Sequence, residues 1–144
     1  MSEMLSKAIL IATNAHDGQF DKGGSPYIMH CIKVMHYTRS TDAEIFAIAV
    51  MHDVVEDTDV TYKDLRDAGM SERVISGICA LTKVPGETYE EYKARVKMNP
   101  DSRIVKMADL RHNSDLSRLK DVTQKDIARI AKYHKFYLEL KEAE

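Results

Sequence analysis

The sequence has few cysteines, no long apolar run and almost no net charge, and each shortage narrows the class of protein. Cys31 and Cys79 both lie in apolar helical patterns without a Cys-x-x-Cys or Cys/His cluster, so we expect reduced core residues and no structural zinc. No apolar stretch approaches the ~20 residues of a membrane-spanning helix, and the first residues lack the basic leader of a signal peptide. The expected compartment is therefore the cytoplasm. With 21 basic and 23 acidic residues, the formal net charge of -2 gives no broad attraction to nucleic acid or to an anionic membrane.

The apolar residues that are present recur with helical spacing. At 144 residues, the chain has the length of one domain, spanning residues 1–144, and its 44% hydrophobic content is that of an ordinary globular protein. No segment alternates as a half-buried strand does. The sequence therefore predicts an all-α fold, a compact bundle of about seven or eight helices.

Local signals predict where several helices begin. Thr41, Thr61 and Thr123 are each followed three residues later by an acidic residue, the spacing of a capping box. The first of these precedes the apolar run IFAIAVMHDVV (45–55), which predicts one continuous third helix. The glycine-rich segment 17–25 predicts a loop between the first two helices.

The strongest chemical signal is the run HDVVEDT at 52–58. His52, Asp53, Glu56 and Asp57 follow an apolar helix, with no Lys or Arg before Lys63. Burying several carboxylates costs several kcal/mol each unless a cation compensates, and a divalent metal would supply that charge. The alternative is a helix end that becomes a solvated acidic turn.

Two other apolar helices are interrupted in the same way. His30 lies within YIMHCIKV, and Asp109 lies within IVKMADLRHN with Asn113 one turn later on the same face. A single buried histidine is more often a core residue than a ligand. Three polar interruptions of three apolar helices instead predict a shared polar site.

Five ordered blocks resemble the HD-type hydrolase domain of the RelA/SpoT family, in particular its stand-alone small alarmone hydrolases, which include metazoan SpoT homologs. The blocks are AHDGQ (15–19), PYIMH (26–30), HDVVEDT (52–58), LTK (81–83) and VKMADLRHN (105–113). The resemblance covers about residues 5–120. It implies an all-α fold, a bound manganese ion, and removal of the 3′-pyrophosphate from ppGpp or pppGpp.

The resemblance also assigns a metal site to this chain. It makes four residues the metal ligands: His30, His52, Asp53 and Asp109. Two imidazoles and two carboxylates form a mixed nitrogen and oxygen site that suits Mn²⁺, with Fe²⁺, Co²⁺ and Zn²⁺ as alternatives.

The same resemblance assigns residues to catalysis and to the substrate. Glu56 and Asp57 match an acidic pair beside the attacking water, with Glu56 assigned to proton transfer and Asp57 to orientation. Asn113 matches a residue that contacts the nucleotide ribose. Lys22 and Tyr27 match the nucleotide-binding loop, although a surface lysine and a packing tyrosine are the plain alternatives.

The chain departs from its relatives in that loop. Related bacterial loops read RKSGE where this chain reads DKGGS, so Asp21 replaces an arginine that stacks on guanine and Gly23 lacks a side-chain hydroxyl. A carboxylate cannot provide that cation–π contact. The alternative functions are therefore an HD-type phosphatase for another nucleotide, such as NADPH or a modified tRNA end, or a non-catalytic nucleotide-binding domain.

The expected partner is a small-molecule nucleotide. Neither a membrane nor an extended nucleic-acid surface is indicated, and a homo-oligomer is left open. We expect a free-standing hydrolase.

Overall fold

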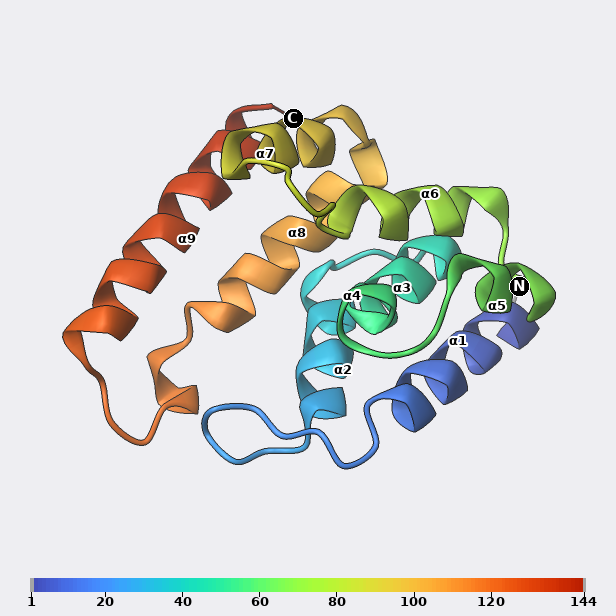
Figure 1. The fold of residues 1–144 in the computed structure, drawn as a ribbon, viewed down its shortest axis with the longest axis horizontal. Coiled ribbons are helices and arrows are strands. Elements are labelled where there is room, and N and C mark those ends of the chain that lie inside the picture. Colours follow the sequence, from blue (N-terminus) through green and yellow to red (C-terminus); the bar gives the residue numbers. More distant parts are fainter. Residues whose placement is uncertain (1, 144) are drawn as a thin grey trace.

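The chain folds into helices that surround one apolar helix (Figure 1). The computed structural model describes residues 2–143. In chain order, the helices are α1 (Ser2–Ala15), α2 (Tyr27–Tyr37), α3 (Ala43–Val50), α4 (Val54–Asp57), α5 (Tyr62–Asp67), α6 (Glu72–Leu81), α7 (Tyr89–Met98), α8 (Pro100–Asn113), the 3-10 turn η1 (Leu116–Arg118) and α9 (Gln124–Glu142). Within this part of the chain, the one β-type pairing is an isolated bridge between Phe20 and Pro26. The predicted all-α bundle is confirmed.

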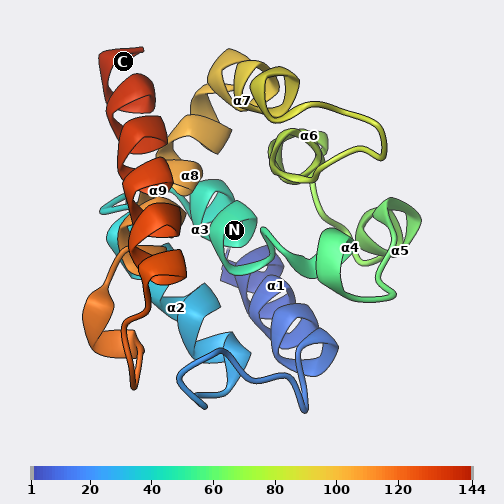
Figure 2. The ribbon, with the colours of Figure 1, turned by 60° about the vertical axis from the view of Figure 1, so that its left-hand side comes forward.

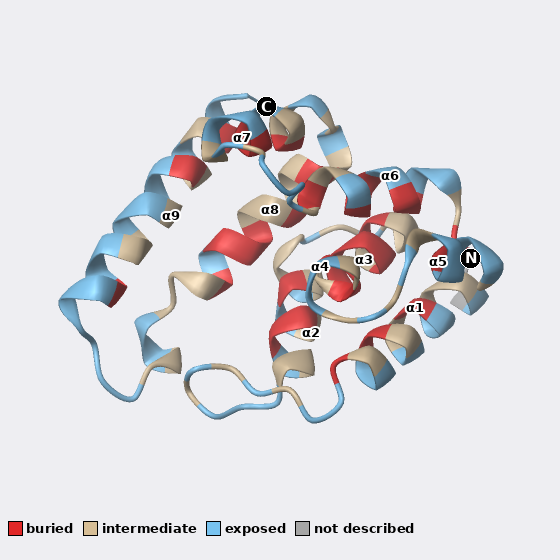
Figure 3. Ribbon diagram, in the orientation of Figure 1, coloured by how far each residue is buried: buried red, intermediate tan, exposed pale blue. Residues whose placement is uncertain are grey.

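The central helix is α3, the most apolar segment of the chain. Its residues are mostly buried, and it contacts α1, α2, α6 and α8. Figure 3 shows this buried centre surrounded by helices whose outer faces are exposed. Gly77 of α6 allows one of these approaches, because a Cβ atom there would lie 2.5 Å from Cδ1 of Ile48 in α3.

The prediction of one continuous third helix is wrong. α3 ends at Val50, and α4 begins only at Val54. The cause is the His52 imidazole, whose Nδ1 atom lies 2.7 Å from the Ala49 carbonyl oxygen and donates to it. That carbonyl would otherwise accept from the backbone amide of Asp53, so the side chain competes with the helix and ends it.

Helix starts follow local capping signals in most cases. The capping boxes at Thr61 and Thr123 are confirmed, whereas α3 is capped by Asp42 instead of Thr41. The Asp42 side chain accepts from the Glu44 amide two residues later, a shorter spacing than the capping box requires. Thr88 forms a further capping box at the start of α7.

Helix α9 closes the bundle by packing along α8 (Figure 1). Phe136 of α9 is buried against Tyr89 and Tyr92 of α7, with ring centroids 6.0 and 6.5 Å away. Figure 2 shows α9 and the short helices α4 and α5 at opposite sides of the molecule. Helices α2, α3 and α8 pack against one another.

The two cysteines lie in different environments. Cys31 in α2 is buried as expected, but Cys79 is exposed on α6, so its prediction as a core residue is wrong. Helical periodicity places residue 79 next to the buried residues Ile78 and Leu81, yet its own side chain points outward. None of the described helices is both long and apolar enough to cross a membrane.

Candidate metal centre and nucleotide pocket

Four side chains from three parts of the chain converge in the interior. His30 comes from α2, Asp109 from α8, and the pair His52 and Asp53 from the turn between α3 and α4. His30 Nε2 and His52 Nε2 lie 3.0 and 3.2 Å from Asp109 Oδ1. His52 Nε2 also lies 3.0 Å from Asp53 Oδ2. The fold thus brings together all four residues that the sequence analysis assigned to a metal.

These distances match those between neighbouring ligand atoms around one cation. Metal–ligand bonds of about 2.1 Å that meet at right angles place neighbouring donor atoms about 3.0 Å apart. His30, His52 and Asp109 are buried, and each offers a donor atom within 4.8 Å of the others. The geometry of these three residues therefore fits a single divalent cation, and Asp53 adjoins them through His52 Nε2.

A hydrogen bond fixes the protonation of His52 for this task. The Ala49 carbonyl oxygen can only accept, so the proton lies on His52 Nδ1. The Nε2 atom, which faces both aspartates, is therefore the nitrogen that can donate a lone pair to a metal. A backbone carbonyl commonly orients metal-binding histidines in this way.

His30 is oriented by another histidine, His112 of α8. The two Nδ1 atoms lie 2.7 Å apart, and the rings stack with centroids 4.9 Å apart. Burial, together with the charges of Arg118 and His30, lowers the pKa of His112 to about 4. A neutral His112 can accept the Nδ1 proton of His30, which leaves His30 Nε2 free to face Asp109.

Asp109 receives further support from its own helix. Its Oδ2 atom accepts from Lys106 Nζ at 2.9 Å, and its Oδ1 atom accepts from Asn113 Nδ2 at 3.0 Å. These residues lie three and four positions away on α8, so they share one face with Asp109. Lys106 thus supplies a positive charge beside the cluster, which the run at 52–58 does not contain.

The pKa shifts of the clustered residues indicate that the cluster stabilises an added positive charge. Burial alone would lower the pKa of His52, but the charges of Asp53 and Asp109 outweigh burial and hold it well above its usual value. Burial would raise the pKa of Asp53, yet His52 lowers it to about 2. Burial acts likewise on Asp109, but Lys106 and His52 hold its pKa well below the usual range. The donor set therefore fits a divalent cation in charge as well as in geometry.

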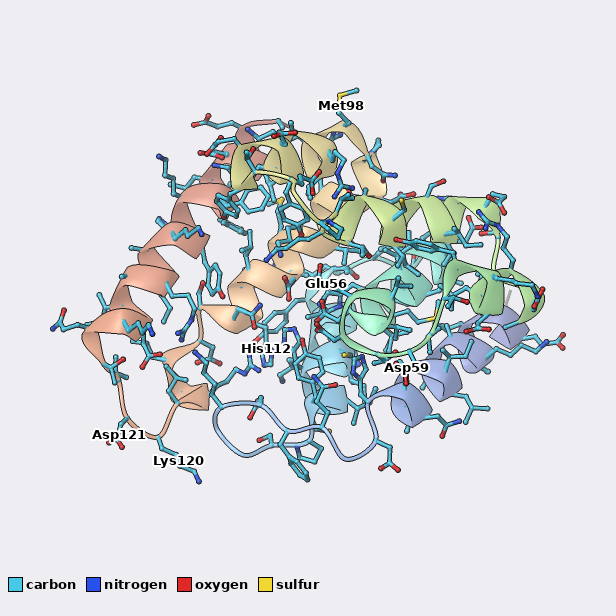
Figure 4. All side chains as sticks on the ribbon, viewed as in Figure 1. Glu56, Asp59, Met98, His112, Lys120 and Asp121 are labelled. Carbon is cyan, nitrogen blue, oxygen red and sulfur yellow. The ribbon has the colours of Figure 1, made fainter. Side chains whose placement is uncertain are left out.

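A second acidic group adjoins the first. Asp53, Glu56 and Asp57 each offer a carboxylate oxygen within 4.8 Å of the others, and both Glu56 and Asp57 are exposed. Figure 4 shows Glu56 on the inner side of α4, facing the middle of the bundle. Glu56 Oε1 accepts from the backbone amide of Lys83 at 2.8 Å. Burial and the charges of Asp53 and Glu56 raise the pKa of Asp57.

A pocket opens beside the cluster. It lies between the 17–25 loop and the chain that links α8 to α9, and its volume is about 280 Å³. Lys22, Tyr27 and Asn113, the three predicted substrate residues, all line it. The Tyr27 hydroxyl also donates to Asp53 Oδ2, so Tyr27 and Asn113 connect the pocket to the cluster.

The sequence analysis gave no role to two residues of this region, His112 and Arg118. Helical spacing could have indicated His112, because it lies three positions from Asp109. Arg118 also lines the pocket, and no local pattern identifies it. His16 is buried, and its Nδ1 atom lies 2.8 Å from Gln19 Oε1 at the start of the 17–25 loop.

A helical bundle with a buried His-Asp cluster defines the HD-type class of proteins, and comparison with known proteins narrows the class to one family. No family model matches the chain. It is 33% identical over 138 residues to the bifunctional (p)ppGpp synthase/hydrolase SpoT of Escherichia coli, which covers 87% of this chain and 20% of that protein. It is 31% identical over 128 residues to the guanosine-3′,5′-bis(diphosphate) 3′-pyrophosphohydrolase of Danio rerio, which covers 80% of this chain and 70% of that protein.

A solved structure shares the fold. A metazoan ortholog of SpoT, described as hydrolysing ppGpp, superposes with a TM-score of 0.77 at 23% identity over 95% of this chain and 84% of that chain. The chain spans about a fifth of the length of the SpoT protein of Escherichia coli. It belongs to the family of SpoT-related HD-domain hydrolases, as its five sequence blocks predicted.

Proposed function

We propose that the chain is a metal-dependent hydrolase that removes the 3′-pyrophosphate from (p)ppGpp, giving GDP or GTP and pyrophosphate. The observation that carries the proposal is the convergence of His30, His52, Asp53 and Asp109 beside a pocket with basic and aromatic lining. The activity named for the Danio rerio relative supports the same reaction.

The four convergent residues would hold Mn²⁺, the metal that suits a mixed set of imidazole and carboxylate donors. A divalent cation there would lower the pKa of coordinated water and withdraw charge from the phosphoryl group. The chain contributes the preset orientation: Ala49 fixes His52, and His112 fixes His30. Both imidazoles then present Nε2 to the same point.

The reaction needs a base for the attacking water. Water attacks the phosphorus attached to the 3′ oxygen, the bond between that phosphorus and the 3′ oxygen breaks, and the 3′ hydroxyl receives a proton. Glu56 would transfer the proton, and its contact with the Lys83 amide through Oε1 supports this role because it leaves Oε2 for water. Asp57, one residue further in α4, would orient that water.

The remaining residues would bind the nucleotide. Asn113 presents an amide that can both donate and accept, which suits a ribose hydroxyl, and it already contacts Asp109. Lys22 is exposed at the pocket, where its charge can meet phosphate. Tyr27 would hold Asp53 through its hydroxyl while its ring lines the pocket.

The test is release of pyrophosphate from ppGpp by the purified chain with Mn²⁺. We expect turnover that EDTA abolishes, and loss of turnover in Asp53→Asn and Glu56→Gln while both proteins stay folded by circular dichroism. General acid–base groups typically contribute about 10²–10⁴-fold in rate, so Glu56→Gln should fall in that range.

Asp59→Asn is the matched control. Asp59 is an exposed acid two residues beyond α4, and Figure 4 shows it on the outside of the connection to α5. This variant should keep full turnover. Robust hydrolysis of NADPH or of another nucleotide, with none of ppGpp or pppGpp, would overturn the proposed substrate. Unchanged function in Asp53→Asn would instead support a binding domain.

A further inference from the structure

The pocket beside the metal cluster is closed by a contact between distant segments. Figures 1 and 2 both place the loop between α1 and α2 beside η1. At this contact Arg118 Nη2 lies 3.0 Å from Asp21 Oδ2, and 19% and 12% of the two side chains are exposed. This largely buried ion pair joins residues 97 positions apart in the sequence, and it holds one wall of the pocket in place.

Two residues of the loop, Asp21 and Gly23, lie against Arg118. Asp21 accepts from the Ser25 amide at 2.9 Å as well as from Arg118, and these contacts outweigh burial and lower the pKa of Asp21. At Gly23, a Cβ atom would lie 2.0 Å from the Arg118 backbone oxygen, so any side chain there would displace η1. Asp21 and Gly23 therefore both contact Arg118, one at its guanidinium and the other at its backbone oxygen.

Three hydrogen bonds hold the guanidinium of Arg118 in place. Nη1 donates to the His112 carbonyl oxygen at 3.1 Å and to Asn113 Oδ1 at 3.0 Å, which uses both of its protons. Nη2 donates one proton to Asp21. Among residues 2–143, no hydrogen bond uses the Nε proton or the second Nη2 proton. Arg118 therefore keeps two donors, Nε and one proton of Nη2, that no described residue uses, and it lines the pocket.

Two neighbouring donors select a particular purine edge. Guanine presents two adjacent acceptors, O6 and N7, whereas adenine presents an acceptor beside a donor. We propose that Arg118 is a specificity-determining residue that binds the O6/N7 edge of a 6-oxopurine and so favours guanine over adenine nucleotides. The inference rests on the proposed function, since it assigns the base of the nucleotide whose 3′-pyrophosphate is removed.

The contacts along the pocket follow the order of base, ribose and 3′-pyrophosphate in a nucleotide. Asn113 connects Arg118 to Asp109, because its Oδ1 atom accepts from the arginine and its Nδ2 atom donates to the aspartate. A nucleotide with its base at Arg118 would place its ribose at Asn113 and its 3′-pyrophosphate at the cluster. Phe20, which lines the pocket and is 62% exposed, offers an aromatic face near the base.

The experiment is titration calorimetry of the folded chain with GDP and with ADP. The wild type should bind GDP roughly tenfold to a hundredfold more tightly, the discrimination expected of a bidentate arginine. Arg118→Ala should lose that ratio, and so should Arg118→Lys, which keeps the charge but not the paired donors. The second variant decides the question if the first does not fold.

Arg111→Ala is the matched control. Arg111 is exposed on α8, its guanidinium lies 4.6 Å from the centre of the Tyr37 ring, and it does not line this pocket. It should keep the preference for GDP. Equal binding of the two nucleotides by the wild type, or an equal loss of both in Arg118→Lys, would overturn the inference.

Hydrolysis assays with ppGpp and its adenosine counterpart distinguish a failure of this inference from a failure of the proposed function. If the chain hydrolyses neither ppGpp nor its adenosine counterpart, the proposed function fails, while the binding ratio still tests Arg118. If it hydrolyses both at equal efficiency, and Arg118→Lys leaves the ratio unchanged, only the role of Arg118 fails.

Discussion

The contact between His30 and His112 makes a quantitative prediction about metal affinity. His112→Phe removes the acceptor that lies 2.7 Å from His30 Nδ1, in a place where His112 is only 8% exposed. Loss of a residue that orients a metal ligand typically weakens metal binding about 10–100-fold. In free energy, that loss is about 1.4–2.7 kcal/mol.

This loss can be measured as a smaller stabilisation by Mn²⁺. At a fixed excess of metal over both dissociation constants, the stabilisation by ligand falls by the same free energy. For a chain of this length, about 2–4 °C of melting temperature correspond to 1 kcal/mol. The rise in melting temperature from EDTA to Mn²⁺ should therefore be about 3–11 °C smaller in His112→Phe than in the wild type.

Two further variants separate the hydrogen bond from packing. His112→Asn keeps an oxygen that can accept from His30 and should recover part of the Mn²⁺-dependent shift. His36→Phe removes an exposed imidazole from the same helix as His30 and should leave the shift unchanged. A full shift in His112→Phe would refute the reasoning, because His30 would then bind metal without its acceptor.

Three other predictions concern the fold. Gly77→Ala should destabilise the protein by roughly 1 kcal/mol in urea unfolding, because overpacking against Ile48 outweighs the better helix propensity of alanine. Adding Ile48→Val should recover part of this loss. A Gly77→Ala protein more stable than the wild type would contradict this packing. The Thr123 amide and then Arg129 lower the pKa of Asp126 to about 2, so its contribution is present above about pH 4 and is lost as pH falls toward 2. Asp126→Asn should therefore cost stability at pH 5 and little at pH 2, and an equal cost at both would be the contrary result. The exposed Cys79 should react with a thiol reagent in the native state. Cys31 should react only after unfolding, because burial raises the pKa of the Cys31 thiol to about 12. Immediate reaction of both thiols would contradict the burial of Cys31.

The sequence predicts what short-range signals determine. The capping boxes at Thr61 and Thr123 act within three residues, so their helix starts are visible in the sequence itself. The start of α3 is misjudged by one residue, because Thr41 and Asp42 are both good caps and only the backbone path decides between them. The convergence of His30 and Asp109 follows once each is recognised as a polar interruption of an apolar helix.

What the sequence does not predict depends on distant contacts. Asp21 alone predicts the loss of a cation–π contact with guanine, but in the structure its carboxylate pairs with Arg118 of η1. No periodicity connects positions 21 and 118, because the contact joins two segments that lie 97 positions apart. Lys106 is an intermediate case, since its spacing from Asp109 could have indicated an ion pair without showing that the pair is enclosed.

The break between α3 and α4 connects the fold to the chemistry of the site. Consecutive residues of an α-helix project about 100° apart, so adjacent side chains cannot easily reach one point while the helix continues. His52 donates to the Ala49 carbonyl and ends the helix, and Asp53 then turns until its Oδ2 atom lies 3.0 Å from His52 Nε2. The hydrogen bond that fixes the His52 tautomer is thus also the cause of the turn that brings Asp53 to the cluster. An adjacent His-Asp pair at the end of an apolar helix should therefore be interpreted as a turn in the chain, even where hydrophobic periodicity continues through it.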